Sequence, residues 1–450
     1  MVLGLARQGK AVARYLSEQG AHVVVSDLKN PEAVRGEREE LADLPIEFVL
    51  GGHPDSLVEG TDLLCLSGGV PADLPLAQQA RRRGIRITND AQLFLEACPA
   101  RIVGITGSAG KTTTTALVGK MMELHLRGSG RRAWTGGNIG WSPLATLGEM
   151  RPEDIVVLEL SSFQLELMTR SPHVAAVLNL TPNHLDRHRT MEAYASAKAN
   201  VLRHQNPSDV AVLGHEDPGA WGMRKFIRGR LLAFGLEPAA DADGVFVDRG
   251  AFIVRQAGRE RPLCPVETVA LRGRHNLQNV AAACAVACSL DVAPETIESA
   301  IREFKGVAHR LEFVRRVREV DWYNDSIATA PERAMAALRA FEEPIVLLAG
   351  GRDKDLPWAT FAELVCRRVE RLFLFGEAGP KIAQAIGKVE ACDQRIQLVV
   401  CRSLEEAVEA AARVARPGSV VLLSPGGTSF DAFPDFEARG ERFRALVNSL

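Results

Sequence analysis

Short apolar runs alternate with longer amphipathic stretches along the first 90 residues of the chain. Apolar runs of about four residues bounded by turn residues are typical of buried strands, and apolar residues spaced three and four apart are typical of helices. We predict strands at residues 2–3, 22–25, 47–50 and 63–66, and a helix over 10–19. Strands that alternate with helices favour a parallel sheet, so this segment is predicted to be a small α/β domain.

The same alternation returns twice further along the chain. A second set of predicted elements comprises strands 102–106, 155–158 and 174–178 and an Ala-rich helix over 276–290. A third set follows Gly306, with strands 344–349, 372–375 and 420–423. Because domains usually contain about 100 to 200 residues, a chain of 450 residues is expected to hold about three. We predict an α/β protein with domains 1–92, 93–305 and 306–450.

Composition and charge restrict the class of protein. Hydrophobic residues make up 46% and charged residues 24% of the chain, as in globular proteins. No apolar run approaches the ~20 residues that span a bilayer, and the first residues lack a secretory signal. We therefore expect a cytoplasmic protein without membrane contact. The net charge of −2 argues against nucleic-acid binding. The eight cysteines lack metal-ligand spacing, and we expect free buried thiols.

Glycines at two predicted strand ends indicate phosphate-binding turns. Residues 4–9 follow the first strand and Asp27 follows the second, as in half of a Rossmann unit. Ala6 replaces the second glycine there, so a plain strand-to-helix turn is favoured over nucleotide binding when this segment is taken alone.

Residues 104–112 follow the strand 102–106 and precede a helical run. Backbone N–H groups beside glycines converge on phosphate oxygens, Lys111 supplies a mobile cation, and Thr112 offers a hydroxyl to Mg²⁺. Ile105 stands where a strict Walker motif has glycine. We predict phosphate binding, which by itself does not distinguish kinase, ATPase, motor and ligase.

Polar residues after the neighbouring strands limit the chemistry. Glu159 follows strand 155–158 and is well placed to hold Mg²⁺. His184 follows strand 174–178. Its spacing from His188 suggests zinc, but no third ligand stands nearby, and a pair on a helix surface is favoured. From its own surroundings, Lys198 is predicted to be an ordinary exposed lysine.

The order of these segments resembles that of the Mur ligases over nearly the whole chain. The matching segments are 106–112 (TGSAGKT), 136–140 (GGNIG), 159–162 (ELSS), 183–186 (NHLD), 273–276 (GRHN), 309–310 (HR), 324–326 (NDS) and 423–425 (LSP). The resemblance implies an N-terminal Rossmann-like domain that binds UDP, a central P-loop ATPase-like domain and a C-terminal Rossmann-like domain.

The resemblance also implies an ATP site with two Mg²⁺ ions. The residues that would bind ATP are Gly107, Ser108, Ala109, Gly110, Lys111, Thr112, Thr113, Asn276 and Asn279, with Arg310 and Asp325 from the third domain. Thr112 and Glu159 would hold one Mg²⁺, and His184 and a carbamylated Lys198 the other. An ammonium cannot ligate a cation, whereas a carbamate presents anionic oxygens. Lys111, His184 and Lys198 would be catalytic.

Segments 67–71, 350–354 and 424–436 resemble the D-glutamate-adding members of the family. This resemblance implies that the chain joins D-glutamate to UDP-N-acetylmuramoyl-L-alanine through an acyl phosphate, as a step of peptidoglycan synthesis. The residues implied for the nucleotide-sugar are Arg7, Gln8, Asp27, Lys29, Ser67, Gly69, Asn138 and Ser161. Those implied for D-glutamate are Thr329, Lys354, Ser429, Phe430 and Phe436. We expect a monomer.

Three alternatives remain. A folylpolyglutamate-type ligase shares the central motifs but usually lacks the N-terminal domain, and another Mur-type ligase would take a different amino acid. A non-catalytic nucleotide-binding regulator would keep the phosphate loop without needing His184, Lys198 and Arg310 together. The chain departs from the family at Ala6, at Ala109, where Asn is usual, and at Ile327, where Lys is common.

Overall fold

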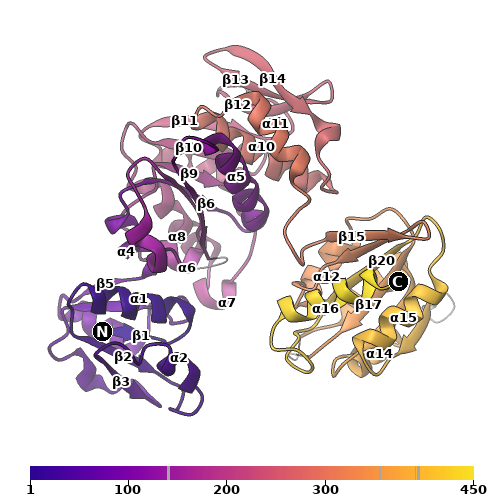
Figure 1. The fold of residues 1–450 in the computed structure, drawn as a ribbon, viewed down its shortest axis with the longest axis horizontal. Coiled ribbons are helices and arrows are strands. Elements are labelled where there is room, and N and C mark those ends of the chain that lie inside the picture. Colours follow the sequence, from indigo (N-terminus) through magenta and orange to yellow (C-terminus); the bar gives the residue numbers. More distant parts are fainter. Residues whose placement is uncertain (139–141, 354–355, 391, 393–395) are drawn as a thin grey trace. The chain divides into compact units, whose positions relative to one another are not determined.

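The structure, a computed structural model, describes residues 1–138, 142–353, 356–390, 392 and 396–450. The chain divides into two compact units (Figure 1). The first comprises Met1–Val269 and His275–Phe304, and the second comprises Ala270–Arg274 and Lys305–Leu450. Each unit is built on α/β sheets, as predicted.

The N-terminal sheet of the first unit is parallel, with strand order β3-β2-β1-β4-β5. Its strands are β1 (Val2–Leu3), β2 (Val23–Asp27), β3 (Ile46–Leu50), β4 (Leu63–Leu66) and β5 (Arg86–Thr88). Its helices are α1 (Arg7–Glu18), α2 (Arg35–Glu39), η1 (Asp55–Val58), α3 (Pro75–Arg82) and α4 (Asp90–Ala97). Helix α1 starts three residues earlier than predicted. A side chain at Gly9 would place its Cβ 1.8 Å from the carbonyl oxygen of Gly4, so glycine permits this close helix-to-strand packing.

The second sheet of this unit has the order β14-β13-β12-β11-β10-β9-β6-β8-β7. Its strands are β6 (Arg101–Thr106), β7 (Ala133–Gly137), β8 (Ile155–Glu159), β9 (Val174–Val177), β10 (Val210–Gly214), β11 (Arg230–Phe234), β12 (Gly244–Asp248), β13 (Ala251–Gln256) and β14 (Arg259–Pro265). Its helices are α5 (Lys111–Leu126), η2 (Pro143–Glu149), α6 (Ser162–Glu166), α7 (Leu185–His188), α8 (Met191–Arg203), α9 (Pro218–Trp221), η3 (Gly222–Phe226), η4 (Val266–Thr268), α10 (Arg274–Ser289) and α11 (Pro294–Glu303). The antiparallel extension β12–β14 was not predicted, because its outer strand is largely polar and exposed.

Strand β6 lies between β8 and β9, and all three are parallel. Ile105 pairs with Glu159, and Thr106 pairs with Val177. The carboxyl ends of parallel strands meet at one edge of a sheet. The phosphate loop, Glu159 and the segment after β9 are therefore brought to the same edge.

The sheet of the second unit has the order β15-β16-β20-β17-β18-β19, in which β15 is antiparallel to β16 and the other pairs are parallel. The strands are β15 (Glu312–Val317), β16 (Val320–Asn324), β17 (Ile345–Gly350), β18 (Val369–Phe375), β19 (Gln397–Val400) and β20 (Val420–Gly426). The helices are α12 (Pro331–Leu338), α13 (Ala359–Arg368), α14 (Gly379–Ile386), α15 (Leu404–Val414) and α16 (Phe436–Asn448). Among the helices of the described ranges, none is both long enough and apolar enough to cross a bilayer.

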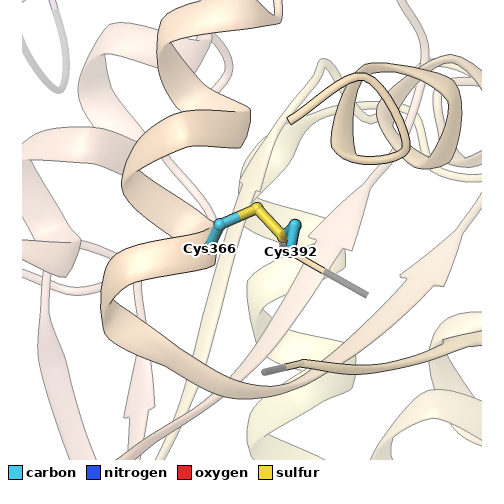
Figure 2. Close-up of a disulfide and its surroundings, with 2 residues drawn as sticks. All are labelled: Cys366 and Cys392. Atoms are coloured by element: carbon cyan, nitrogen blue, oxygen red, sulfur yellow. A yellow bond between two sulfur atoms is a disulfide. The ribbon is translucent and has the colours of Figure 1, made fainter. Parts of the chain in front are cut away.

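One cysteine prediction is wrong. Cys366 of α13 and Cys392 form a disulfide with a Cα–Cα distance of 5.4 Å (Figure 2). The two residues are 26 positions apart, and only the packing of α13 beside α14 brings them together. Across the described residues, the remaining cysteines are free as expected, and all but the half-buried Cys98 are buried.

Asp90 is a buried acid at the start of α4, between the two sheets of the first unit. Its side-chain oxygens accept hydrogen bonds from Nε2 of Gln164 at 3.2 and 3.4 Å. Asn89 donates to the carbonyl oxygen of Gln164 at 2.7 Å, so α4 and α6 are joined by polar contacts. Burial outweighs these hydrogen bonds and raises the pKa of Asp90 to about 6.

We expect Asp90→Asn to raise the free energy of unfolding at neutral pH by about 3 kcal/mol, because a shift of roughly two pKa units corresponds to that energy. In the folded state the carboxyl releases its proton only near pH 6. The cost of the buried charge therefore grows as pH rises between about 4 and 6 and is constant above. Urea unfolding at about pH 5 should show about half the gain measured at about pH 8. An equal gain at both pH values would contradict this origin.

Candidate active site

The phosphate loop runs from the end of β6 to the first turn of α5. Gly110 caps α5 in the left-handed conformation, with φ of 83°. A Cβ on Gly110 would lie 2.1 Å from Oδ1 of Asn279, so only glycine fits between loop and helix α10. Asn279 in turn donates to Oδ1 of Asn276 at 3.1 Å. Both asparagines predicted for the nucleotide therefore lie beside the phosphate loop.

Asn179 holds the centre of this loop and was not predicted. Its Oδ1 accepts from the amide of Ala109 at 2.8 Å, and its Nδ2 donates to the carbonyl oxygen of Ala109 at 3.1 Å. These bonds use only the backbone of residue 109, so the departure from Asn at that position leaves them intact. The criterion that singled out Glu159, a polar residue just after a parallel strand, applies equally to Asn179.

Two lysines meet at the carbonyl oxygens of the loop. Lys111 Nζ donates to the oxygens of Gly107 and Ser108 at 3.0 and 3.2 Å. Lys198 Nζ donates to the oxygen of Gly107 at 2.9 Å and to Oγ1 of Thr106 at 3.1 Å. Lys198 is only 1% exposed, so the prediction of an exposed lysine is wrong. Helix α8 packs against α6 and β6 on the face that carries Lys198, and the small alanines around Lys198 allow this close packing.

Burial, and secondly the charge of Lys111, lower the pKa of Lys198 well below that of a free lysine. Glu159 opposes this shift, but with a smaller effect. Desolvation disfavours the ammonium form. The site therefore favours a neutral amine at Lys198 beside the cationic Lys111.

Glu159 lies 2% exposed at the end of β8. One of its oxygens accepts from Oγ1 of Thr112 at 2.8 Å, and the other accepts from Nδ2 of Asn138 at 2.9 Å. Arg7 of the N-terminal part donates to the carbonyl oxygen of Asn138 at 3.2 Å. These contacts join residues predicted for Mg²⁺ to residues predicted for the nucleotide-sugar.

His184 precedes the single turn α7 in a left-handed conformation. Its ring contacts Phe163 edge-on, with centroids 5.1 Å apart. His188 stacks on the same Phe163 and forms a 2.9 Å hydrogen bond with Oγ of Ser162. His188 is 8% exposed, so the prediction of a surface pair is wrong for this histidine. The turn α7 packs against α8 and directs His188 inward.

Tyr194 connects the histidines with the phosphate loop. Its ring lies 5.3 Å from that of His188, and its hydroxyl lies 3.1 Å from Oγ of Ser108. Ser108 also donates to the carbonyl oxygen of Thr181 at 2.8 Å. The segment carrying His184 is therefore attached to the loop carrying Lys111 through packed side chains.

Loops of the N-terminal sheet hold the residues predicted for the nucleotide-sugar. Gln8 accepts from the amide of Gly68 at 2.9 Å, which ties α1 to the loop after β4 that contains Ser67 and Gly69. Asp27 accepts from the amides of Leu5 and Lys29 at 2.7 and 2.9 Å. Ser161 caps α6 in a reciprocal capping box with Gln164. All these loops follow strands at the carboxyl edge of their sheets.

In the second unit, Asp325 follows β16 and is buried. It accepts from Oγ of Ser424 at 2.8 Å and from the amide of Leu311 at 3.2 Å. Burial outweighs these bonds and raises its pKa to about 7. Arg310 is half-buried and Thr329 lies just before α12. Lys354 lies outside the described residues.

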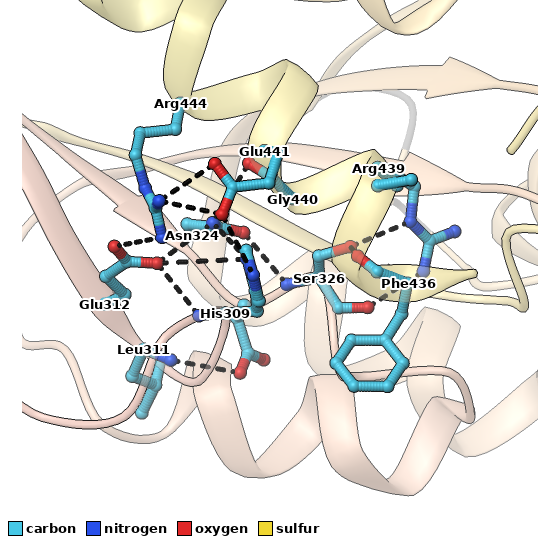
Figure 3. Close-up of polar contacts among 12 residues, drawn as sticks. His309, Leu311, Glu312, Asn324, Ser326, Phe436, Arg439, Gly440, Glu441 and Arg444 are labelled. Carbon is cyan, nitrogen blue, oxygen red and sulfur yellow. Dashed lines mark hydrogen bonds and ion pairs between the residues drawn. The ribbon is translucent and has the colours of Figure 1, made fainter. Parts of the chain in front are cut away.

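A buried arginine organises the residues after β16 and β20 (Figure 3). Arg439 is fully buried and donates to Oγ and O of Ser326 at 3.0 and 2.9 Å and to the carbonyl oxygens of Gly427 and Thr428. Ser326 donates to the carbonyl oxygen of Phe436 at 2.7 Å. Ser429 is buried next to this network, and Phe430 is 57% exposed. No local pattern distinguished Arg439 from the other arginines of α16.

The first unit thus combines a phosphate loop, a buried acid beside its threonine and two lysines at its carbonyl oxygens, which defines a P-loop nucleotide-binding protein with flanking α/β domains. The chain matches three family profiles: the MurD-like N-terminal domain of Mur ligases over residues 1–89, the Mur ligase middle domain over 105–287, and the glutamate ligase domain of Mur ligases over 309–427. This protein belongs to the Mur ligase family, whose members are ATP-dependent ligases.

Curated relatives match the entire chain. Proteins named UDP-N-acetylmuramoylalanine--D-glutamate ligase from Symbiobacterium thermophilum and Pelotomaculum thermopropionicum are 42% and 40% identical, each over 100% of this chain and 97% of the relative. The UDP-N-acetylmuramate-alanine ligase of Thermotoga maritima has a similar fold, with a TM-score of 0.58 and 21% identity, and the match covers 100% of this chain and 98% of that one. A second Thermotoga maritima ligase, MurF, solved with ADP, has a TM-score of 0.56 and 20% identity over 96% of this chain and 97% of that one. The predicted three-domain Mur ligase architecture is confirmed.

Proposed function

We propose that this protein joins D-glutamate to UDP-N-acetylmuramoyl-L-alanine and converts ATP to ADP and phosphate, as a step of peptidoglycan precursor synthesis. Full-length relatives that carry the name of this ligase support the choice of substrates. The observation that supports the chemistry is the convergence of Lys111, Glu159 and Lys198 at the carboxyl edge of β6 and β8. A non-catalytic regulator would not need this set.

The reaction requires activation of a carboxylate, because a carboxylate is a poor electrophile. The γ-phosphoryl group of ATP moves to the carboxylate of the L-alanine residue, which gives an acyl phosphate and ADP. The amine of D-glutamate then attacks the acyl carbon and displaces phosphate. Lys111 lies where it can offset the charge of the transferring phosphoryl group, and the loop amides bind the remaining phosphate oxygens.

The oxygen donors at the loop fit Mg²⁺. The Thr112 hydroxyl and the buried Glu159 carboxylate are 2.8 Å apart, and hydroxyl and carboxylate oxygens are hard ligands. Within the described ranges, no group of three or more His, Cys, Asp and Glu side chains is arranged to hold a metal. Mg²⁺ commonly binds through one or two carboxylates together with substrate phosphates. The bound ion would stabilise negative charge on the phosphates.

We assign the second Mg²⁺ to His184 and a carbamylated Lys198. The lowered pKa of Lys198 favours the neutral amine, which adds to CO₂ to form a carbamate and releases one proton. Carbamylation converts this neutral amine into an anionic oxygen donor. The anion lies next to the ammonium group of Lys111, which attracts it, whereas an ammonium at Lys198 would be repelled.

The remaining assignments follow the three-domain arrangement 1–92, 93–305 and 306–450. We assign UDP-sugar binding to the loops with Arg7, Gln8, Asp27, Lys29, Ser67 and Gly69, with Asn138 and Ser161 nearer the reacting carboxylate. D-Glutamate is assigned to Thr329, Lys354, Ser429, Phe430 and Phe436, and the nucleotide also to Arg310 and Asp325. The enzyme is proposed to act as a cytoplasmic monomer.

Substrate choice is tested by offering UDP-N-acetylmuramoyl-L-alanine and ATP with D-Glu, L-Glu, L-Lys or D-Ala. We expect phosphate release at least about a hundredfold faster with D-Glu than with the other three, because a pocket built for one carboxylate arrangement leaves polar groups unpaired with the others. Release that requires D-Ala or L-Lys instead would overturn the assignment.

A further inference from the structure

We propose that Arg187 is a positioning residue that holds the loop after β4 in register with His184, and thereby places the nucleotide-sugar for phosphoryl transfer. The inference rests on the proposed function. The observation behind it is that one side chain of the central part binds three successive backbone carbonyls of the N-terminal part. Both parts belong to the first unit.

Arg187 projects from the single turn α7. Its Nη1 donates to the carbonyl oxygens of Gly68 and Gly69 at 3.4 and 3.2 Å, and its Nη2 donates to that of Val70 at 2.5 Å. The guanidinium also lies over the ring of Phe163, 4.4 Å from its centroid. A planar group with five N–H donors suits this arrangement of carbonyls and an aromatic face, whereas an ammonium does not.

The loop itself depends on side chains from elsewhere for its shape. The amide of Gly68 is bound by Gln8, and the amide of Val70 donates to the carbonyl oxygen of Ser67 at 2.8 Å. Arg187 binds the carbonyl groups of this loop. With both amide and carbonyl groups bound, the loop is held in one conformation, which lowers the entropy lost when a ligand binds.

Helix α7 connects this loop with His184, the proposed metal ligand. Arg187 lies within the turn α7, and the residues that cap this turn at its two ends, His184 and Arg189, have left-handed φ values of 53° and 65°. Phe163 contacts both the His184 ring and the Arg187 guanidinium. A shift of the glycine loop would therefore displace Arg187, Phe163 and His184 together.

A small cavity of about 10 Å³, enough for about one water molecule, lies beside this contact. It is lined by Ser67, Gly68, Phe163, Gln164 and Arg187 together with apolar residues of both parts. Glu166 also lines it, and burial raises the pKa of this carboxyl despite the nearby charge of Arg187. Arg187 therefore both binds the loop and lines this small cavity.

The test compares Arg187→Ala with Arg187→Lys and the control Arg189→Ala in the full-length enzyme. Arg189 lies two positions along and forms an ion pair with Asp73 at 2.9 Å, but the two side chains are 78% and 61% exposed. We expect Arg187→Ala to raise KM for UDP-N-acetylmuramoyl-L-alanine at least about tenfold, with KM for ATP within about twofold. Arg187→Lys should recover only part of the loss, and Arg189→Ala should match the wild type.

Equal changes in the KM values of all substrates, or equal effects of the changes at residues 187 and 189, would overturn the inference. If Arg187→Ala fails to fold, Arg187→Lys decides: a folded variant with wild-type KM for the nucleotide-sugar also overturns it. The proposed function fails separately, when the wild-type enzyme does not release phosphate with D-glutamate. If the wild-type enzyme turns over D-glutamate and Arg187→Ala has unchanged kinetics, the proposed function is supported and the positioning role of Arg187 is refuted.

Discussion

Lys111→Ala is expected to lower turnover with ATP by about a hundredfold to a thousandfold, because a preorganised cation at a transferring phosphoryl group contributes roughly 3 to 4 kcal/mol to the transition state. Lys111 Nζ donates to carbonyl oxygens of its own loop at 3.0 and 3.2 Å. Urea unfolding of the variant shows whether it is folded before turnover is compared. Trapping of the acyl phosphate with hydroxylamine measures the loss of phosphoryl transfer. Phosphate release measures the loss of overall turnover.

Lys120→Ala is the matched control for this prediction. Lys120 belongs to the same helix α5, and its ion pairs with Glu123 and Glu303, at 3.7 and 3.1 Å, involve largely exposed carboxylates. Surface ion pairs contribute about 0 to 1 kcal/mol, so this variant should keep its activity. Undiminished acyl-phosphate formation by Lys111→Ala would contradict the assigned role of the phosphate loop.

Removal of CO₂ is expected to lower the activity of the wild-type enzyme at least about tenfold, and added bicarbonate should restore it, because metal ligands must be anionic or neutral donors. Lys198→Ala should lose at least about a hundredfold and gain nothing from bicarbonate. The control variant is Lys225→Ala, because Lys225 is exposed and its ammonium lies over the ring of Phe226, 5.2 Å from the centroid. Enrichment with ¹³C-bicarbonate should give one carbamate resonance that is absent from Lys198→Ala.

The sign of the pH dependence follows from the lowered pKa of Lys198. The amine is neutral at a pH where an ordinary lysine is an ammonium, so carbamylation is expected near neutral pH. At acidic pH the amine is protonated and the carbamate is lost, so the effect of bicarbonate should disappear there. Full activity in CO₂-free buffer at neutral pH would refute the carbamate.

Much of the fold was predictable, because apolar runs and helical spacings are local features. The predicted strands of the first sheet coincide with β1 to β4 within one or two residues, and Glu159 ends β8 as expected. The phosphate loop was recognised because glycine and lysine in a strand-to-helix turn have a direct backbone and charge requirement. The antiparallel strands β12 to β14 were missed. Polar and exposed positions interrupt the apolar pattern of β14, whereas β12 and β13 are short strands with apolar residues.

Burial of polar side chains was predicted less well. Lys198 and His188 were expected at the surface, but helix packing places both against the active-site edge. Arg187 and Arg439 bind backbone carbonyls of residues distant in sequence, so no local spacing reveals them. The pairing of Cys366 with Cys392 likewise depends on how α13 and α14 pack.

By itself, the sequence determined the α/β class, the phosphate loop with Lys111 and Thr112, and the resemblance to Mur ligases, since each rests on residues close together or on their order along the chain. Only the tertiary structure decided that Lys198 is buried beside Lys111 and that Arg187 joins the glycine loop to the segment of His184. The physical reason is that desolvation and hydrogen bonding depend on which surfaces meet, and strand register and helix packing bring those surfaces together from distant parts of the chain.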